Sequence, residues 1–204
     1  MNKLREKYKD DRFWEEIWDL GEYAQAKELE GDNLTIIDIG CLSGEFGWWM
    51  YDRAKIIYAI EPHLPSYNEL INNVTEYDKD FKFRCFNQAL SDYNGEGKLT
   101  IKGRGGHALS LEGSDFETVK VQTLESFMNN HGIDKVDIIK FDVEGAEDRI
   151  FSGFDSIASR IRFLIGEVHD DPRLDFLTKK FQNNEFEVEF HKGTIITALN
   201  TKWE

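Results

Sequence analysis

Short apolar runs recur along this chain, and segments with the spacing of amphipathic helices separate them. Most of the runs lack the strict polar alternation of half-exposed strands, which is typical of strands buried on both faces. The expected strands cover residues 34–38, 56–60, 81–90, 136–141 and 161–168, and a closing pair covers 186–190 and 194–199. This pattern predicts an α/β fold in three layers, with a doubly wound, mostly parallel sheet and an antiparallel C-terminal edge hairpin.

A second, smaller hairpin is expected around residues 97–122, outside the main alternation. Its strands cover residues 98–102 and 117–121, and a glycine-rich loop over 103–116 joins them. The expected helices between the strands cover residues 65–77, 123–131, 147–157 and 175–184. Helical spacing of this kind provides the covering layers that a parallel sheet requires.

The first thirty residues have helical periodicity, and we expect a helix over residues 3–30. Its apolar face is formed by Phe13, Trp14, Ile17, Trp18 and Leu20. Two tryptophans on one face indicate docking onto a core, and a cover over a substrate mouth or a subunit contact are the alternatives. We therefore divide the chain into an N-terminal helical segment, residues 1–33, and a main domain, residues 34–204.

Composition narrows the classes of partner. The 204 residues carry a formal net charge of −14, which disfavours nucleic acid and anionic membranes. The chain has no apolar run of about 20 residues and no apolar core of a signal peptide near residue 1, so a cytoplasmic location is expected. Cys41 and Cys85 match no metal-binding spacing and are expected to be small, buried residues with free thiols.

Polar and ionisable residues gather where the expected strands end. Ligands of parallel sheets bind outside the carboxyl ends of the strands, so these positions predict a site. Solvated loop starts and helix caps are the alternative explanation. The strand-end residues are Asp38 and Gly40, then Glu61, then Asn87, Gln88 and Ala89, then Lys140, Asp142 and Glu144, and finally Glu167 and His169.

The turn after the first strand carries Gly40 and Gly44, and glycine lets a ligand approach the backbone closely. A plain strand–turn–helix joint would also need glycines. Glu61 ends the second strand about 20 residues later, where an acid accepts hydrogen bonds from a ribose diol. The spacing Asp38-x-Gly40-x-x-x-Gly44 differs from GxGxxG and has no Walker lysine, so a nucleotide-dependent oxidoreductase is disfavoured. S-adenosylmethionine fits this turn, with its adenine near residues 87–92.

Five motifs resemble those of FkbM-type S-adenosylmethionine-dependent methyltransferases, in family order and spacing. They are DIGCLSGEFG, AIEP, QALSD, IIKFDVEGAE and GEVH, over about residues 34–190. The resemblance implies the class I methyltransferase fold and methyl transfer to oxygen, often on a sugar. Cys41 and Leu42 stand where family members usually have Ala-Asn, so backbone contacts would have to replace an amide side chain. The candidate cofactor-binding residues are Asp38, Gly40, Cys41, Gly44, Glu61, Pro62, Gln88, Ala89 and Asp142.

An alcohol acceptor must lose a proton during methyl transfer, and the candidate catalytic residues are, in order, Asp142, His169 and Glu144. Alternatively, these residues and Glu167 hold a divalent cation such as Mg²⁺. Glu147 is expected only to begin its helix.

Two further side chains belong to the same set of candidates. Lys140 shares the strand face of Asp142, and we expect the two to pair, with a plain strand-end lysine as the alternative. His107 in the glycine-rich loop is expected to be solvated, with contact to the acceptor as the alternative.

The sequence therefore predicts an S-adenosylmethionine-dependent O-methyltransferase acting on a sugar or a related small metabolite. Its expected partner is a small-molecule acceptor, a carbohydrate by the resemblance, rather than nucleic acid or a membrane. The sequence does not determine the oligomeric state, and a homo-oligomer is one possibility. The alternative function is a binding or scaffold module that retains the fold without catalysis.

Overall fold

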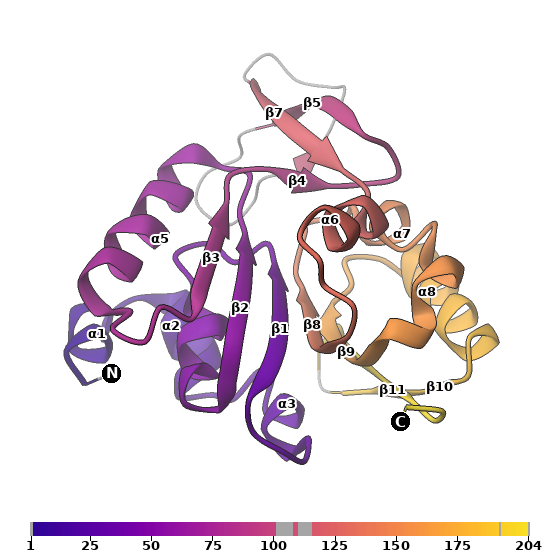
Figure 1. Ribbon diagram of the computed structural model, residues 1–204, viewed down its shortest axis with the longest axis horizontal. Helices are drawn as coiled ribbons and strands as arrows, with labels where there is room; N and C mark the ends of the chain where they lie inside the picture. Colours follow the sequence, from indigo (N-terminus) through magenta and orange to yellow (C-terminus); the bar gives the residue numbers. More distant parts are fainter. Residues whose placement is uncertain (1, 101–107, 110–115, 192, 204) are drawn as a thin grey trace.

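The computed structural model describes residues 2–100, 108–109, 116–191 and 193–203. Its main sheet has seven strands in the order β10-β11-β9-β8-β1-β2-β3 (Figure 1). The five neighbouring strands β9, β8, β1, β2 and β3 run parallel, and β11 pairs antiparallel with β9 and β10. The predicted α/β fold with an antiparallel C-terminal edge is therefore confirmed. The strands are β1 (Leu34–Ile39), β2 (Ala54–Ile60), β3 (Phe83–Phe86), β8 (Val136–Phe141), β9 (Ile161–Glu167), β10 (Phe186–Phe190) and β11 (Ile195–Asn200).

The two central strands explain why the apolar runs are continuous. Ile36 pairs with Ile138 and Ile37 with Ile139 across β1 and β8, and none of the four side chains is exposed. Successive strand residues point to opposite faces. Ile36 and Ile138 accordingly join one core cluster, whereas Ile37 and Ile139 join another. Both faces of the sheet are thus buried.

Helices from different parts of the chain cover the two faces. The helix α5 lies on the side of the sheet opposite to α8 (Figure 1), and Leu70 and Leu177 pack into different core clusters. The helices of the main domain are α4 (Glu45–Trp49), α5 (Leu64–Tyr77), α6 (Leu124–Asn130), α7 (Glu147–Ile150) and α8 (Asp171–Asn183). The helix predicted over 147–157 is shorter than expected, because the chain continues past Gly153 as the 3₁₀ turns η2 (Phe154–Ser156) and η3 (Ala158–Arg160). A further 3₁₀ turn, η1 (Tyr51–Arg53), precedes β2.

The N-terminal segment forms three short helices, so the prediction of one helix over residues 3–30 is wrong. They are α1 (Asn2–Lys7), α2 (Arg12–Trp18) and α3 (Gln25–Glu28). The Asp11 side chain accepts hydrogen bonds from the backbone N–H groups of Phe13 and Trp14, which starts a new helix. Gly21 then adopts a φ of 68°, which turns the chain after α2.

Two tryptophans of α2 dock the N-terminal segment onto the main domain, as expected. Trp14 Nε1 donates to Ser43 Oγ over 3.3 Å, and Trp18 Nε1 donates to the Glu45 carbonyl over 3.2 Å. The segment is therefore held against the turn that follows β1. The division of the chain after residue 33 stays a prediction.

A second sheet lies beyond the end of β3, in the order β4-β7-β5-β6. It comprises β4 (Ala89–Leu90), β5 (Gly95–Thr100), β6 (Ala108–Leu109) and β7 (Phe116–Gln122). The antiparallel pairing of β5 with β7 confirms the extra hairpin. His107 lies outside the described residues, as does most of the predicted loop over 103–116. No helix in the described ranges is long and apolar enough to cross a membrane.

Candidate active site

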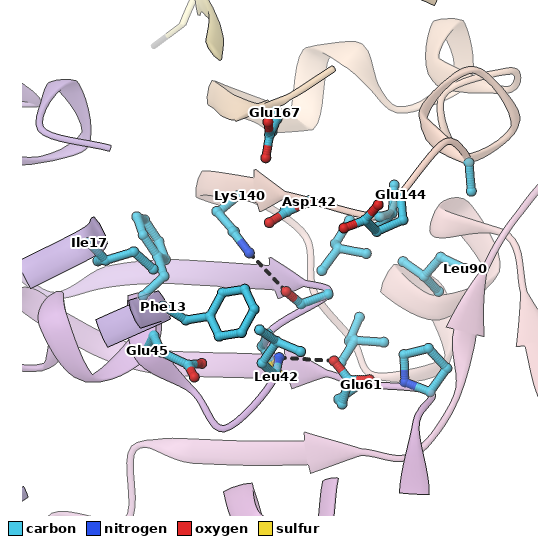
Figure 2. A pocket seen from close by; sticks show the side chains of 18 of the residues that line it. Phe13, Ile17, Leu42, Glu45, Glu61, Leu90, Lys140, Asp142, Glu144 and Glu167 are labelled. Carbon is cyan, nitrogen blue, oxygen red and sulfur yellow. Dashed lines mark hydrogen bonds between the residues drawn. The ribbon is translucent and has the colours of Figure 1, made fainter. Parts of the chain in front are cut away.

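A cavity of about 360 Å³ opens where β1, β2, β8 and β9 end. Figure 2 shows Glu61 and Leu42 on one side of it, and Asp142, Glu144 and Glu167 on the other. The N-terminal segment supplies a further wall, which consists of Arg12, Phe13, Glu16, Ile17, Glu22 and Tyr23. The cavity therefore lies between the predicted strand-end residues and the N-terminal segment, which we expected mainly to pack against the core.

Gly40 lets two loops meet at the bottom of the cavity. Its φ is 71°, and a Cβ built there would lie 1.9 Å from the Asp142 carbonyl oxygen. Gly44 has a different role, because a Cβ there would lie 2.8 Å from the Leu70 side chain of α5. Gly40 and Cys41 line the cavity, whereas Gly44 does not. The second glycine thus serves packing between helices.

Glu61 links the end of β2 to the glycine turn. Its Oε2 accepts a hydrogen bond from Leu42 N over 2.9 Å, and its Oε1 accepts one from His63 N over 2.8 Å. Burial raises the pKa of Glu61 to about 8, although both N–H donors act in the opposite direction. A carboxylate has about four lone-pair positions, so two remain for a ligand. Leu42 therefore contributes its backbone to this site, and its φ of 46° orients that N–H.

The cavity continues past Glu61 along β4. Pro62, Gln88 and Ala89 line it, and their role as cofactor-binding residues stays a prediction. Gln88 is 3% exposed, and its Nε2 has no hydrogen-bond acceptor among the described residues. Asn87 donates instead to the Glu61 and Pro62 carbonyls over 3.0 and 2.9 Å, which ties β3 to the end of β2. The orphaned Gln88 amide is a donor that a nucleobase could satisfy.

Lys140 pairs with Asp38 rather than with Asp142, which corrects the expected pairing. The distance from Lys140 Nζ to Asp38 Oδ1 is 3.5 Å, and the same ammonium donates to the Gly40 carbonyl over 2.8 Å. The register explains this choice, because Asp38 and Lys140 are direct neighbours across β1 and β8. Asp38 is fully buried below the cavity and does not line it. Its contact is with the lysine that supports the turn.

The three predicted catalytic residues converge. His169 Nε2 lies 3.8 Å from Asp142 Oδ1 and 3.6 Å from Glu144 Oε2. Its Nδ1 lies 2.5 Å from Glu147 Oε1, and Glu147 is completely buried. Burial lowers the pKa of His169, but the hydrogen bond to Glu147 and the three neighbouring carboxylates raise it to about 9.

Sequence reasoning missed Glu147. It does begin α7, as predicted, but it also holds His169 from behind. Its position in the motif next to Asp142 and Glu144 was the available signal, and its partner lies 22 residues further along the chain.

Glu167 and Cys41 also line the cavity. Glu167 accepts a hydrogen bond from Thr194 Oγ1 over 2.6 Å. Both cysteines are free thiols, as expected, but only Cys41 is buried, whereas Cys85 in β3 is partly exposed. Burial raises the pKa of Cys41, which disfavours the thiolate that a nucleophile would require.

Comparisons with known proteins identify the family and the fold. A family model described as the methyltransferase FkbM domain matches residues 38–188. No protein of curated function matches the sequence significantly. The family model thus covers most of the main domain, and it does not include the N-terminal segment.

Three solved structures share the fold at low sequence identity. The FkbM methyltransferase from Methylobacillus flagellatus superposes with a TM-score of 0.65 at 16% identity, over 87% of this chain and 46% of that one. This chain thus spans about half of the length of that protein. The precorrin-6y C5,15-methyltransferase from Geobacter metallireducens gives 0.56 at 12% identity, over 89% and 88% of the chains. TrmK from M. capricolum, in complex with S-adenosylhomocysteine, gives 0.52 at 14% identity, over 88% and 68%. With the family model spanning most of its sequence, the chain belongs to the FkbM methyltransferase domain family, whose members use S-adenosylmethionine.

Proposed function

We propose that this protein transfers a methyl group from S-adenosylmethionine to a hydroxyl oxygen of a small, sugar-like acceptor. The observation that carries the proposal is the pairing of two chemistries in one cavity. Glu61 offers free acceptor positions at one end, and Asp142, Glu144 and His169 converge at the other. Family membership supports the methyl donor, and the choice of oxygen as acceptor is our inference.

The described residues fit the cofactor. Glu61 would accept hydrogen bonds from the ribose, and the orphaned Gln88 amide would face the adenine. The turn at Gly40 would carry the methionyl part, since the sheet order takes a ligand from β2 across β1 to β8. When bound, the cofactor supplies an electrophilic methyl group. Its reacting end would then lie beside Asp142.

The residues of the chain have three tasks in this reaction. The cavity walls align the acceptor and exclude water, which accounts for much of the rate enhancement in an in-line displacement. Asp142 accepts the proton of the acceptor hydroxyl, and His169, which also faces Glu144, orients that carboxylate. A divalent cation at the same residues belongs to this proposal as well, and its ligands are argued separately below.

The charge of the cavity supports an acceptor without phosphate groups. Glu16, Glu22, Glu144 and Glu167 all line the acceptor end. Repulsion between these acids contributes to the pKa of Glu22, which burial and the neighbouring Glu167 raise to about 7. A neutral polyol has hydroxyl donors for such carboxylates, whereas a phosphate would be repelled. The volume of about 360 Å³ suits a small molecule.

The test uses the full chain and S-adenosylmethionine with a labelled methyl group. We expect binding of S-adenosylhomocysteine in calorimetry and transfer of the label to the oxygen of at least one member of a panel of neutral sugars and polyols. Label on nitrogen or carbon would contradict the O-methyl assignment. Cofactor binding without transfer to any acceptor would favour the alternative, a binding module that retains the fold.

A further inference from the structure

We infer that Asp142, Glu144 and His169 form a binding site for one divalent cation of the Mn²⁺ or Mg²⁺ type at the acceptor end of the cavity. Cation binding itself is independent of the reaction, and only its role in activating the acceptor rests on the proposed function. The three residues belong to rigid positions, since Asp142 follows β8, His169 follows β9 and Glu144 lies in the loop before α7.

The spacing of the three side chains fits a shared cation. One ligand atom from each residue lies within 4.8 Å of the other two. His169 Nε2 is 3.8 Å from Asp142 Oδ1 and 3.6 Å from Glu144 Oε2. A cation bound at about 2.1–2.2 Å brings adjacent ligands to about 3 Å of one another. Side-chain rotations that move each ligand atom by less than about 1 Å would therefore complete the coordination.

A buried carboxylate orients the imidazole toward this point. Glu147 is not a ligand, and its Oε1 accepts from Gly145 N over 3.1 Å and contacts His169 Nδ1 over 2.5 Å. A carboxylate on Nδ1 fixes the tautomer that presents the Nε2 lone pair, which is the usual support of a metal-bound histidine. Glu147 has no exposed surface, and it lies between His169 on one side and Arg173 on the other, with Arg173 Nε 3.5 Å from its Oε2. A surface histidine among acids needs no such support.

The neighbouring cations are committed elsewhere. Lys140 contacts Asp38 and the Gly40 carbonyl, and Arg173 pairs with Glu147, Asp148 and Asp170. Among the described residues, no lysine or arginine forms an ion pair with Asp142 or Glu144. Both side chains nonetheless reach the cavity, with 30% and 37% of their surface exposed. The ion-pair partner of both carboxylates is His169, and Lys140 acts on Asp142 from a greater distance. A divalent ion would take the place between the two carboxylates that His169 Nε2 now faces.

The ligand set determines the kind of cation and of acceptor. Two carboxylates favour Mg²⁺ and Mn²⁺, and the imidazole shifts the preference toward Mn²⁺. Three protein ligands leave coordination positions open toward the cavity. An acceptor with two adjacent hydroxyls could occupy two of them, and the cation would lower the pKa of the reacting hydroxyl. The acceptor class that fits is thus a vicinal diol.

The test is a titration of the metal-free full chain with MnCl₂, followed by electron paramagnetic resonance of free Mn²⁺ and by calorimetry. We expect saturable binding of about one Mn²⁺ per chain. Glu144→Gln and His169→Gln should each weaken it at least about tenfold. His191→Gln is the matched control, because His191 Nε2 lies 3.9 Å from Glu189 Oε2 outside the cavity and should leave Mn²⁺ binding unchanged.

Glu147→Gln separates an orienting role from a merely structural one. We expect about tenfold weaker Mn²⁺ binding in a chain whose circular dichroism is unchanged, as for other residues that support a metal ligand. Because Glu144 is partly exposed, Glu144→Gln keeps the test decisive if Glu147→Gln does not fold.

Two outcomes overturn the inference: a folded parent chain that binds no Mn²⁺ at millimolar concentration, and equal binding by the parent, Glu144→Gln and His169→Gln. Titration with S-adenosylhomocysteine in the presence of EDTA tests the proposed function separately. Cofactor binding without Mn²⁺ binding refutes the cation site alone. Mn²⁺ binding without cofactor binding supports the cation site and refutes the proposed transferase.

Discussion

The two ends of the cavity are built from different kinds of groups. At the end near β2, backbone N–H groups of Leu42 and His63 hold a single buried carboxylate. At the end near β8 and β9, side chains hold one another, with His169 between Glu147, Asp142 and Glu144. The first arrangement depends on one local turn, whereas the second requires two loops to meet. The comparison leads to the prediction that changes near β2 affect cofactor binding and changes near β8 and β9 affect acceptor chemistry, and each prediction below tests that division.

Gly40→Ala should have the largest effect, because the backbone at this position carries both ends. The new Cβ would lie 1.9 Å from the Asp142 carbonyl oxygen at a φ of 71°. We expect the free energy of unfolding to fall by about 4 kcal/mol or more. Urea unfolding measures it. Gly153→Ala is the control, since nothing lies within 4 Å of its Cβ and its effect should be small.

Asp142→Asn should affect the acceptor end alone. Removing the proton acceptor should reduce kcat about 100-fold or more. The Kd for S-adenosylhomocysteine should change only slightly, because Glu61 and the turn are intact. Single-turnover kinetics with labelled cofactor, together with calorimetry, measure the two quantities. A variant with full turnover would remove Asp142 from the reaction.

Glu61→Gln should affect the cofactor end alone. The amide faces one of the two N–H donors with its own NH₂ group and leaves fewer acceptor positions for the ribose. A buried donor without an acceptor costs about 1–3 kcal/mol, so affinity for S-adenosylhomocysteine should fall about 10- to 100-fold. Mn²⁺ binding should be unchanged in the same titrations. An equal loss of both would show that the two ends are one coupled unit.

The pH dependence of stability should also report Glu61. Burial raises its pKa from 4.5 to about 8, so the folded state holds this proton more tightly than the unfolded state. Its contribution to the free energy of unfolding is therefore fully present below pH 4.5 and is lost as the pH rises toward 8. We expect a difference on the order of 2 kcal/mol between the parent chain and Glu61→Gln across that window. Denaturant unfolding at several pH values measures it, and parallel profiles would contradict it.

The hydrogen bond from Trp14 Nε1 to Ser43 Oγ should have the smallest effect, about 1 kcal/mol, and its loss should spare both ends. Trp14→Phe removes it together with part of a buried ring, whose lost packing adds to the change in the free energy of unfolding. A double-mutant cycle with Ser43→Ala isolates that contact. A large drop in the affinity for S-adenosylhomocysteine would show that the docked segment also shapes the cofactor end.

Sequence reasoning succeeded where the cause was local. Strands buried on both faces appear as apolar runs, so the sheet was predictable. Gly40 and Glu61 were predictable because a turn and a strand end each have short-range signatures. The break of the N-terminal helix at Asp11 was missed, since apolar periodicity continued through Phe13 and Trp14 and masked the cap.

It failed where the cause was the pairing of distant elements. Parity along one strand suggested Asp142 as the partner of Lys140, but the register between β1 and β8 brings Asp38 beside it. Contact between Glu147 and His169 depends on β8 and β9 being neighbours. The cofactor-binding roles of Asp38 and Gly44 stay predictions, and the structure adds that Asp38 contacts Lys140 and that Gly44 packs against α5.

The wall formed by the N-terminal segment has an evolutionary consequence. It lies upstream of residue 38, where the match to the family begins, and it packs into the core cluster that contains Ile36 and Ile138. Substitutions there can reshape the mouth of the cavity while the turn at Gly40 and the Glu61 side chain stay unchanged. Selectivity for new acceptors could thus diverge in the first thirty residues, and exchanging that segment between relatives is a direct route to altered specificity.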